Sequence, residues 1–286
     1  MTLRTLAAVA VTFAAACGLA AAPAAADFRM EKQLALAPGG ELVVSSDGGS
    51  ITVVGDSPGG VHVIFTSEDD DVAERYTFGF DAQPGRVTVS SKRKRGSGGW
   101  RNWDNRHGVQ IEVHAPRQAD VDLDSSGGGL RVSRLEGDVR LRSSGGGLRV
   151  ADVKGAVDGE SSGGSITVHR VEGDLRLDTS GGGVEVVEVI GNVEAGSSGG
   201  GITVENVAGD VDVSTSGGGV RVSLLPSARV TLDASSSGGS VTCDLPVMVR
   251  GKVSRSSLRG EINGGGHPYR LRSSGGGIRI RPASLD

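Results

Sequence analysis

The chain has 286 residues, of which 48 are glycine and only 3% are aromatic. Ordinary globular proteins contain roughly 7% glycine, so this composition predicts many tight turns and a core built from Val, Leu and Ile. The formal net charge of −4 argues against general nucleic-acid binding. The five histidines are scattered without the spacing of metal ligands, and we expect no metal site and no cofactor.

Residues 1–26 have the features of a secretory signal peptide. Arg4 precedes an apolar stretch, and three alanines ending at Ala26 form a small-residue cleavage site. The apolar stretch is too short for a comfortable membrane span of about 20 residues, so no transmembrane span is expected. Cys17, with alanines before it and Gly18 after it, leaves lipoprotein anchoring as an alternative. The sequence therefore predicts export to the periplasm, the cell surface or the medium.

Residues 27–118 are predicted to form an irregular β lead-in that caps the rest of the chain. Short strand-like runs surround Leu42, Ile51, Val61, Val87 and Val109, without a fixed spacing. A cap is expected because the open end of a stacked β structure is an unpaired sheet edge that invites aggregation.

One segment of this lead-in, residues 92–106, is strongly basic. It holds six cations, one acid and both tryptophans of the chain. Trp and Arg are enriched at binding hot spots, and cations beside aromatic rings suit anionic lipid headgroups or acidic glycans. We expect an exposed loop that binds a partner through Lys92, Arg93, Lys94, Arg95, Trp100, Arg101, Trp103 and Arg106. The alternative is a solvated loop balanced by the acidic run at residues 68–71.

From residue 119 to the end of the chain, an 18-residue repeat dominates. The apolar residues of each repeat fall into five columns, headed by Leu130, Val132, Leu135, Val139 and Leu141, and the third column runs to Leu225. Their alternation with polar residues is typical of strands that bury one face. We predict an all-β fold in which residues 119–286 form a β-solenoid of 18-residue coils with parallel strand pairing. The first glycine of a Ser-Gly-Gly element marks the period at Gly127, Gly145, Gly163, Gly181, Gly199 and Gly217.

The two corners of each coil have different chemistry. At one corner, glycines permit a sharp turn, and the Ser/Thr pairs before them, such as Ser143 and Ser144, should stack as a hydroxyl ladder. At the other corner, Asp138 and its equivalents are expected to cap turns. The repeat loosens near Pro226, where three extra residues predict a looped-out corner, and a last clear unit begins at Ser273.

The repeated Ser-Ser-Gly-Gly-Gly-Φ-x-Val, the Gly-Asp-Val half a unit later and the closing Gly-Glu-Ile-Asn-Gly-Gly-Gly at residues 260–266 resemble one bacterial family. It is an exported domain family of unknown function, described as "putative adhesins" with β-strand repeats, and the resemblance spans residues 30–283. The resemblance implies an envelope or surface protein without established catalytic residues.

These observations favour a non-enzymatic exported cell-envelope or surface protein, an adhesin or scaffold that presents a rigid β-solenoid. Its partner is unknown; an envelope glycan, an anionic surface or another protein are the candidates. One alternative is a polysaccharide-active β-helix enzyme, for which Glu194 and Asp212 are the neighbouring outward acids. Another is a periplasmic accessory or stress-response module. Cys243 occupies an inward position and is expected to be buried and inert.

Overall fold

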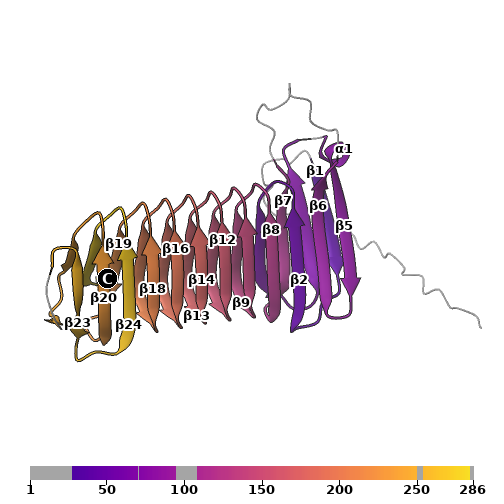
Figure 1. The fold of residues 1–286 in the computed structure, drawn as a ribbon. Coiled ribbons are helices and arrows are strands. Elements are labelled where there is room, and N and C mark those ends of the chain that lie inside the picture. The colour runs from indigo at the N-terminus through magenta and orange to yellow at the C-terminus, as the bar shows by residue number, and fades with distance from the viewer. Residues whose placement is uncertain (1–27, 70, 95–107, 250–253, 284–286) are drawn as a thin grey trace, which may run out of the picture.

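The computed structural model describes residues 28–69, 71–94, 108–249 and 254–283, so the predicted signal peptide and Cys17 lie outside the described residues. The described chain forms an elongated stack of β-coils, in which two sheets face each other and neither sheet closes on itself (Figure 1). The predicted all-β solenoid is confirmed. Among the described residues there is one helix, the single turn α1 (Val72–Arg75).

The two sheets contain 12 and 13 strands among the described residues. From the N-terminal end of the stack onward, the first sheet consists of β1 (Phe28–Leu34), β4 (Val61–Ser67), β7 (Gln110–Pro116), β3 (Ile51–Ser57), β9 (Leu130–Glu136), β11 (Leu148–Lys154), β13 (Ile166–Glu172), β15 (Val184–Ile190), β17 (Ile202–Ala208), β19 (Val220–Leu224), β25 (Ile278–Pro282) and β21 (Val241–Cys243). In the same direction, the second sheet consists of β5 (Tyr76–Gln83), β6 (Arg86–Arg93), β2 (Gly40–Ser46), β8 (Ala119–Ser125), β10 (Val139–Ser143), β12 (Val157–Ser161), β14 (Leu175–Thr179), β16 (Val193–Ser197), β18 (Val211–Thr215), β24 (His267–Ser273), β20 (Val230–Ser236), β23 (Ser257–Ile262) and β22 (Met248–Val249).

The 18-residue register is exact in the central coils. Val139 pairs with Val157 in the second sheet, and Leu148 pairs with Ile166 in the first, both in parallel. The same step relates every coil from β8 and β9 to β18 and β19. The predicted coil length and parallel pairing are therefore correct.

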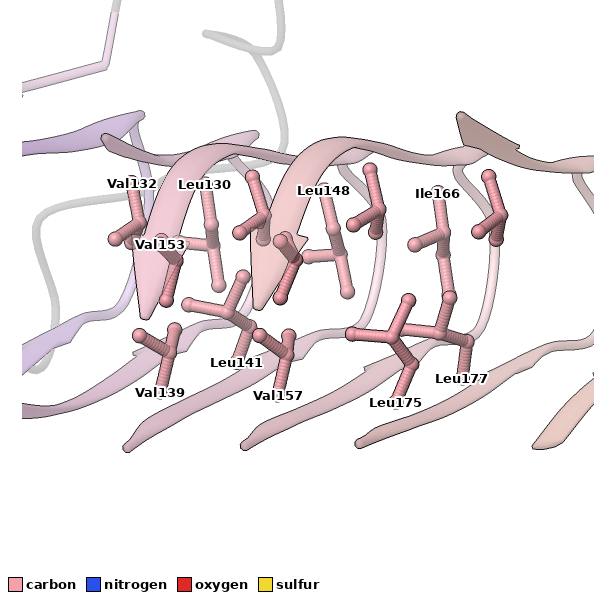
Figure 2. Packing of buried hydrophobic residues seen from close by; sticks show 14 of the residues in the cluster. Leu130, Val132, Val139, Leu141, Leu148, Val153, Val157, Ile166, Leu175 and Leu177 are labelled. Atoms are coloured by element: carbon pink, nitrogen blue, oxygen red, sulfur yellow. The ribbon is translucent and has the colours of Figure 1, made fainter. Parts of the chain in front are cut away.

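The core lies between the two sheets and is filled by the predicted columns. Figure 2 shows Leu130, Leu148 and Ile166 of the first sheet pointing toward Leu141 and Leu177 of the second, and each of these side chains is at most 1% exposed. Because the columns between the two sheets are apolar and each central coil is covered by its two neighbours, burial is continuous along the central stack.

The third column departs from prediction at its end, where Leu225 is 40% exposed and Leu224 is buried instead. In the preceding coil, the equivalent of Leu224 is Asn206, which has a left-handed backbone with φ of 52°. This conformation interrupts the strand alternation and turns the following residue inward. Position 224 has no positive φ, so simple strand alternation brings Leu224 into the core. The left-handed residues form a column of their own, namely Arg134, Asp152, Arg170, Glu188 and Asn206.

At both ends of the stack, the order of the coils differs from their order in the chain. The coil of β2 and β3 lies between that of β6 and β7 and that of β8 and β9. The coil of β24 and β25 lies between that of β18 and β19 and that of β20 and β21. The extra residues near Pro226 do form a turn. At this turn the chain skips one position in the stack, which the later coil of β24 and β25 occupies. The unit predicted at Ser273 is thus a regular coil within the stack.

Antiparallel strands cover both ends of the stack. At the N-terminal end, β1 and β4 are the outermost strands of the first sheet and β5 is the outermost strand of the second. At the other end, β23 and β22 extend the second sheet. Phe65 packs edge-on against Phe78 with ring centroids 4.8 Å apart. This aromatic cluster lies within residues 27–118, the predicted N-terminal β cap.

The hydroxyl ladder is present, but only the first residue of each Ser/Thr pair belongs to it. Ser143 is buried and donates its Oγ hydroxyl to the carbonyl of Gly128 in the preceding coil, at 3.0 Å. It also accepts a hydrogen bond from the N–H of Gly146, at 2.9 Å. Ser144 is exposed. Each buried hydroxyl therefore satisfies two backbone groups that the tight glycine corner leaves without a strand partner.

Candidate binding surfaces

The basic segment 92–106 begins with the last two residues of β6 and ends four residues before the start of β7. β6 pairs with β2 and β7 pairs with β3, so β6 and β7 together form one coil. In the coil of β2 and β3, residues 46–50 make a short corner, in which Ser46 bonds to Gly48. Segment 92–106 therefore replaces a serine–glycine corner. Ser91, at the place of the ladder serine, is fully buried, and its Oγ has no partner among the described residues.

Of the predicted binding residues, Lys92, Arg93 and Lys94 are described, and all three are exposed. Arg93 donates to the hydroxyl of Tyr76 at 3.2 Å, its guanidinium lies 5.7 Å from the centre of that ring, and its backbone N–H donates to Asp47. Lys94 donates from Nζ to the carbonyl of Ala73 at 2.9 Å. These two cations thus anchor the base of the segment.

The other predicted binding residues, Arg95, Trp100, Arg101, Trp103 and Arg106, lie outside the described residues. Near the base of the segment, Arg75 of α1 forms ion pairs with Asp69 and, at 2.7 Å, with Asp71 of the acidic run. The acidic run therefore has a structural partner of its own.

The outer face of the second sheet carries a row of charges in which most neighbours have opposite sign. Arg176 pairs with Glu194 at 3.7 Å, and Arg270 pairs with Asp212 at 3.8 Å. Glu194 and Asp212 do occupy register neighbours, as the enzyme alternative requires. Each is more than half exposed and faces an arginine on its other side. The pair therefore lacks the burial that usually tunes a general acid.

The aspartate corner of the coils forms a ladder of backbone caps. Asp138 Oδ1 accepts the N–H of Ala156 in the next coil at 2.9 Å, and Asp174 Oδ1 accepts the N–H of Asn192 at 2.8 Å. Asn192 repeats the contact with its amide oxygen, which accepts the N–H of Asp210 at 3.0 Å. The predicted turn-capping role is confirmed. Among the described residues, no group of three or more His, Cys, Asp or Glu side chains could hold a metal ion.

Between the aspartate corner and the charged row lies a groove of about 860 Å³ that runs along the second sheet from Glu41 to Arg270. Nine acidic and three basic side chains line this groove. It is an open surface with a strong excess of negative charge, suited to contact with a cationic partner rather than to enclosing a small molecule.

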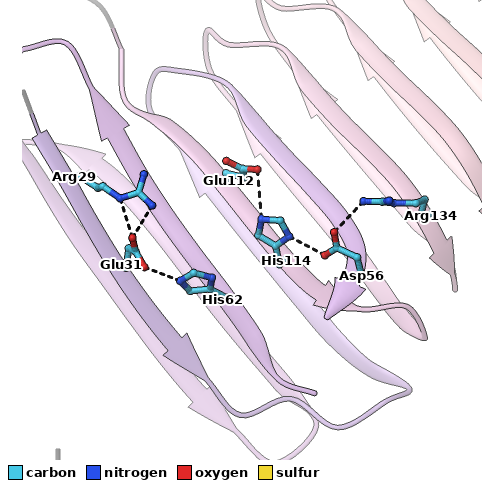
Figure 3. A network of polar contacts seen from close by, with 7 residues as sticks. All are labelled: Arg29, Glu31, Asp56, His62, Glu112, His114 and Arg134. Atoms are coloured by element: carbon cyan, nitrogen blue, oxygen red, sulfur yellow. Dashed lines mark hydrogen bonds and ion pairs between the residues drawn. The ribbon is translucent and has the colours of Figure 1, made fainter. Parts of the chain in front are cut away.

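A polar network on the first sheet joins the cap to the solenoid (Figure 3). His62 pairs with Glu31 at 3.0 Å, His114 pairs with Asp56 at 2.7 Å, and Asp56 also pairs with Arg134 at 2.9 Å. The two histidine rings lie 6.2 Å apart. This network could not be predicted from the sequence, because only the antiparallel register of β4 with β7 places His62 opposite His114.

Cys243 is half-buried, less than predicted. It pairs with Ile280 at an inward position of β21, but β21 is the edge strand of the first sheet at the far end of the stack, and no further strand of that sheet follows it among the described residues. Burial raises the pKa of its thiol, which reduces the reactive thiolate fraction at neutral pH.

In the part of the chain that the structure describes, no helix has the length and apolar character needed to cross a membrane.

Comparisons with known proteins relate this architecture to a family. A "putative adhesin" from Bacteroides fragilis has a TM-score of 0.52 at 14% identity, covering 90% of this chain and 97% of that chain. A "putative adhesin" from Parabacteroides distasonis has a TM-score of 0.45 at 11% identity, covering 88% and 97%. The first likeness, at this identity, shows a shared fold. Among curated proteins there is no match.

The family model described as Toastrack DUF4097 matches residues 41–281, which is most of the chain and includes both the cap and the repeats. The match confirms the resemblance to a β-repeat family of unknown function that the serine–glycine repeats indicated. The chain therefore belongs to the Toastrack family.

Proposed function

We propose that this protein is an exported, non-enzymatic scaffold of the cell envelope or cell surface, which binds an anionic partner through segment 92–106. The observation that carries the proposal is the place of this segment. Six cations and two tryptophans stand where the neighbouring coil has a short serine–glycine corner, and this is the clearest departure from a purely structural repeat.

The anchoring of the segment supports a binding role. Arg93 and Lys94 bond to Tyr76 and Ala73 of the cap, so four further cations of the segment, Lys92, Arg95, Arg101 and Arg106, are candidates for the contact with a partner. Cations beside tryptophan bind anionic lipid headgroups, acidic glycans and acidic protein surfaces by the same physics. Export rests on the signal-peptide features of residues 1–26, with lipid anchoring at Cys17 as the alternative.

The experiment replaces Lys92, Arg95, Arg101 and Arg106 with Ser and measures retention on vesicles that contain anionic phospholipid, at low salt. Arg93 and Lys94 stay in place, so the base of the segment keeps its contacts. We expect retention to fall at least tenfold, because each cation near an anionic surface contributes about 1 kcal/mol.

The matched control removes four exposed arginines of the first sheet, Arg131, Arg149, Arg221 and Arg279, and changes the net charge by the same amount. This control should keep most of the retention. Equal loss in both variants would mean that net charge, and not segment 92–106, governs binding, and unchanged retention in the first variant would exclude the segment.

A further inference from the structure

We propose that the acidic groove of the second sheet binds segment 92–106 of a second copy, so that molecules associate head to tail. This inference rests on the proposed function, since it names the anionic partner of the same segment. Self-association is measured separately from vesicle retention, so the head-to-tail contact and the proposed function can each fail without the other.

The excess charge of the groove is concentrated on one side. The arginines of the central row are each matched by a carboxylate, as in the pairs of Arg140 with Asp158, Arg176 with Glu194 and Arg270 with Asp212. On the other side of the groove, Asp120, Asp138 and Asp174 have no cation partner among the described residues. The groove therefore has a nearly neutral row beside a wall of uncompensated carboxylates.

The carboxylates of this wall are held in fixed positions. Asp120, Asp138 and Asp174 each use Oδ1 to accept a backbone N–H of the next coil, at 2.8 to 2.9 Å. The second oxygen of each carboxylate has no hydrogen bond among the described residues. A partner cation thus meets acceptors that are already ordered, which lowers the entropic cost of binding.

The spacing of the wall fits an extended basic chain. Asp138 and Asp174 are two coils apart because Ala156 stands between them, which separates their carboxylates by about 10 Å. Lys92 and Arg95 are three residues apart in the sequence. In an extended chain, residues at this separation are also about 10 Å apart. Segment 92–106 has six cations and one acid, and the groove has nine acids and three cations, so their net charges of +5 and −6 nearly cancel.

A second copy is the occupant that the placement favours. β6, which holds the first two residues of the segment, ends at the serine–glycine corner, whereas the aspartate wall runs along the opposite corner of the same sheet. Five strand residues separate the two corners, a width of about 17 Å. A segment and a groove at different places on one molecule make a heterologous contact, which links copies into chains.

The test is sedimentation velocity of the purified protein at low salt, over a range of concentrations. The groove variant Asp120→Asn, Asp138→Asn and Asp174→Asn removes three charges but keeps the backbone caps, because Asn192 already makes this cap in the native chain. The control variant Glu172→Gln, Glu185→Gln and Glu188→Gln removes three charges from the first sheet. The segment variant replaces Lys92, Arg95, Arg101 and Arg106 with Ser.

We expect the wild type and the first-sheet control to associate at low salt and to lose at least tenfold in association constant at high salt, where charges are screened. The groove variant and the segment variant should each be monomeric alone. Mixed together they should form one-to-one pairs, because each supplies the half that the other lacks.

Two results would overturn the proposal. One is a wild type that stays monomeric at every concentration at low salt, which includes the case of a segment bound to its own groove. The other is association that survives in the groove variant, which would place the contact elsewhere. In both cases, vesicle retention still reports independently on segment 92–106.

Discussion

Ser161 bonds both to the preceding coil and to its own glycine turn: its hydroxyl donates to the carbonyl of Gly146 in the preceding coil at 2.9 Å, and its oxygen accepts the N–H of Gly164 in its own turn at 2.9 Å. The same pair of contacts recurs at Thr179, Ser197 and Thr215. One buried hydroxyl per coil thus fixes the glycine turn and the register between coils at once.

Replacing Ser161 with Ala should destabilise the fold by about 1–3 kcal/mol, because it leaves a partly buried carbonyl and a partly buried N–H without their partner. Replacing the exposed neighbour Ser162 with Ala should change stability by less than about 0.5 kcal/mol. Chemical denaturation of both variants measures the difference. Ser161→Thr is the conservative control, since Thr179 does the same task natively, and equal effects of the two Ala variants would refute the ladder.

The glycine corner makes a second prediction. A Cβ on Gly146 would lie 2.1 Å from the carbonyl oxygen of Gly128, so Gly146→Ala must push two coils apart. We expect a loss of about 3 kcal/mol or more. A Cβ on Gly127 would meet no atom within 4 Å, so Gly127→Ala should be tolerated. Melting temperatures that do not differ between the two variants would contradict the close approach.

The central coils could be predicted from the sequence because each inward residue recurs at a fixed step and sheet alternation is a local rule. The order of the terminal coils could not be predicted in this way. Ser236 and Ser273 both precede a glycine corner, and either coil offers the same backbone edge to β18 and β19. Only long-range pairing places Ser273 next to Thr215.

The candidate binding segment, too, could be predicted from the sequence only in part. Composition alone identified segment 92–106, because six cations and two tryptophans stand out in any arrangement. Its position at a serine–glycine corner depends on the register of Ser91 with Ser46, which brings together residues far apart in the chain. The left-handed column was also missed, since Arg134 and Glu188 are not residue types that favour positive φ.

The left-handed column gives a third prediction. Glu188 has φ of 58°, a conformation that costs a residue with a side chain about 1–2 kcal/mol. Glu185, in the same strand, has an ordinary extended backbone. We expect Glu188→Gly to be more stable than Glu185→Gly by at least about 1 kcal/mol, because only the first change relieves strain. Thermal denaturation measures this difference, and the reverse order of stability would rule out the strain.

Tyr269 makes the stability of the protein sensitive to alkaline pH. Its ring is buried and its hydroxyl donates to the carbonyl of Val207 at 2.9 Å. Burial, and secondarily Asp210, raise the pKa of Tyr269 above its ordinary value. Its contribution is therefore fully present below about pH 10, where the unfolded tyrosine titrates, and is lost as the pH rises above that value.

We expect the ultraviolet absorbance of tyrosinate to show Tyr269 ionising only as the protein unfolds. Tyr269→Phe should lose about 0.5–1.5 kcal/mol at neutral pH through the missing hydrogen bond, and its stability should decline less between neutral and strongly alkaline pH. Ionisation of Tyr269 near pH 10 while the protein stays folded would contradict this account.

The most direct test of the proposed non-enzymatic binding role is incubation of the purified protein with anionic polysaccharides, while both binding and the appearance of new reducing or unsaturated ends are followed. The account predicts binding that decreases at high salt and in the segment variant, with no new ends. Cleavage that disappears in Glu194→Gln and Asp212→Asn variants, while binding persists, would contradict it and would establish the charged face of the second sheet as an active site.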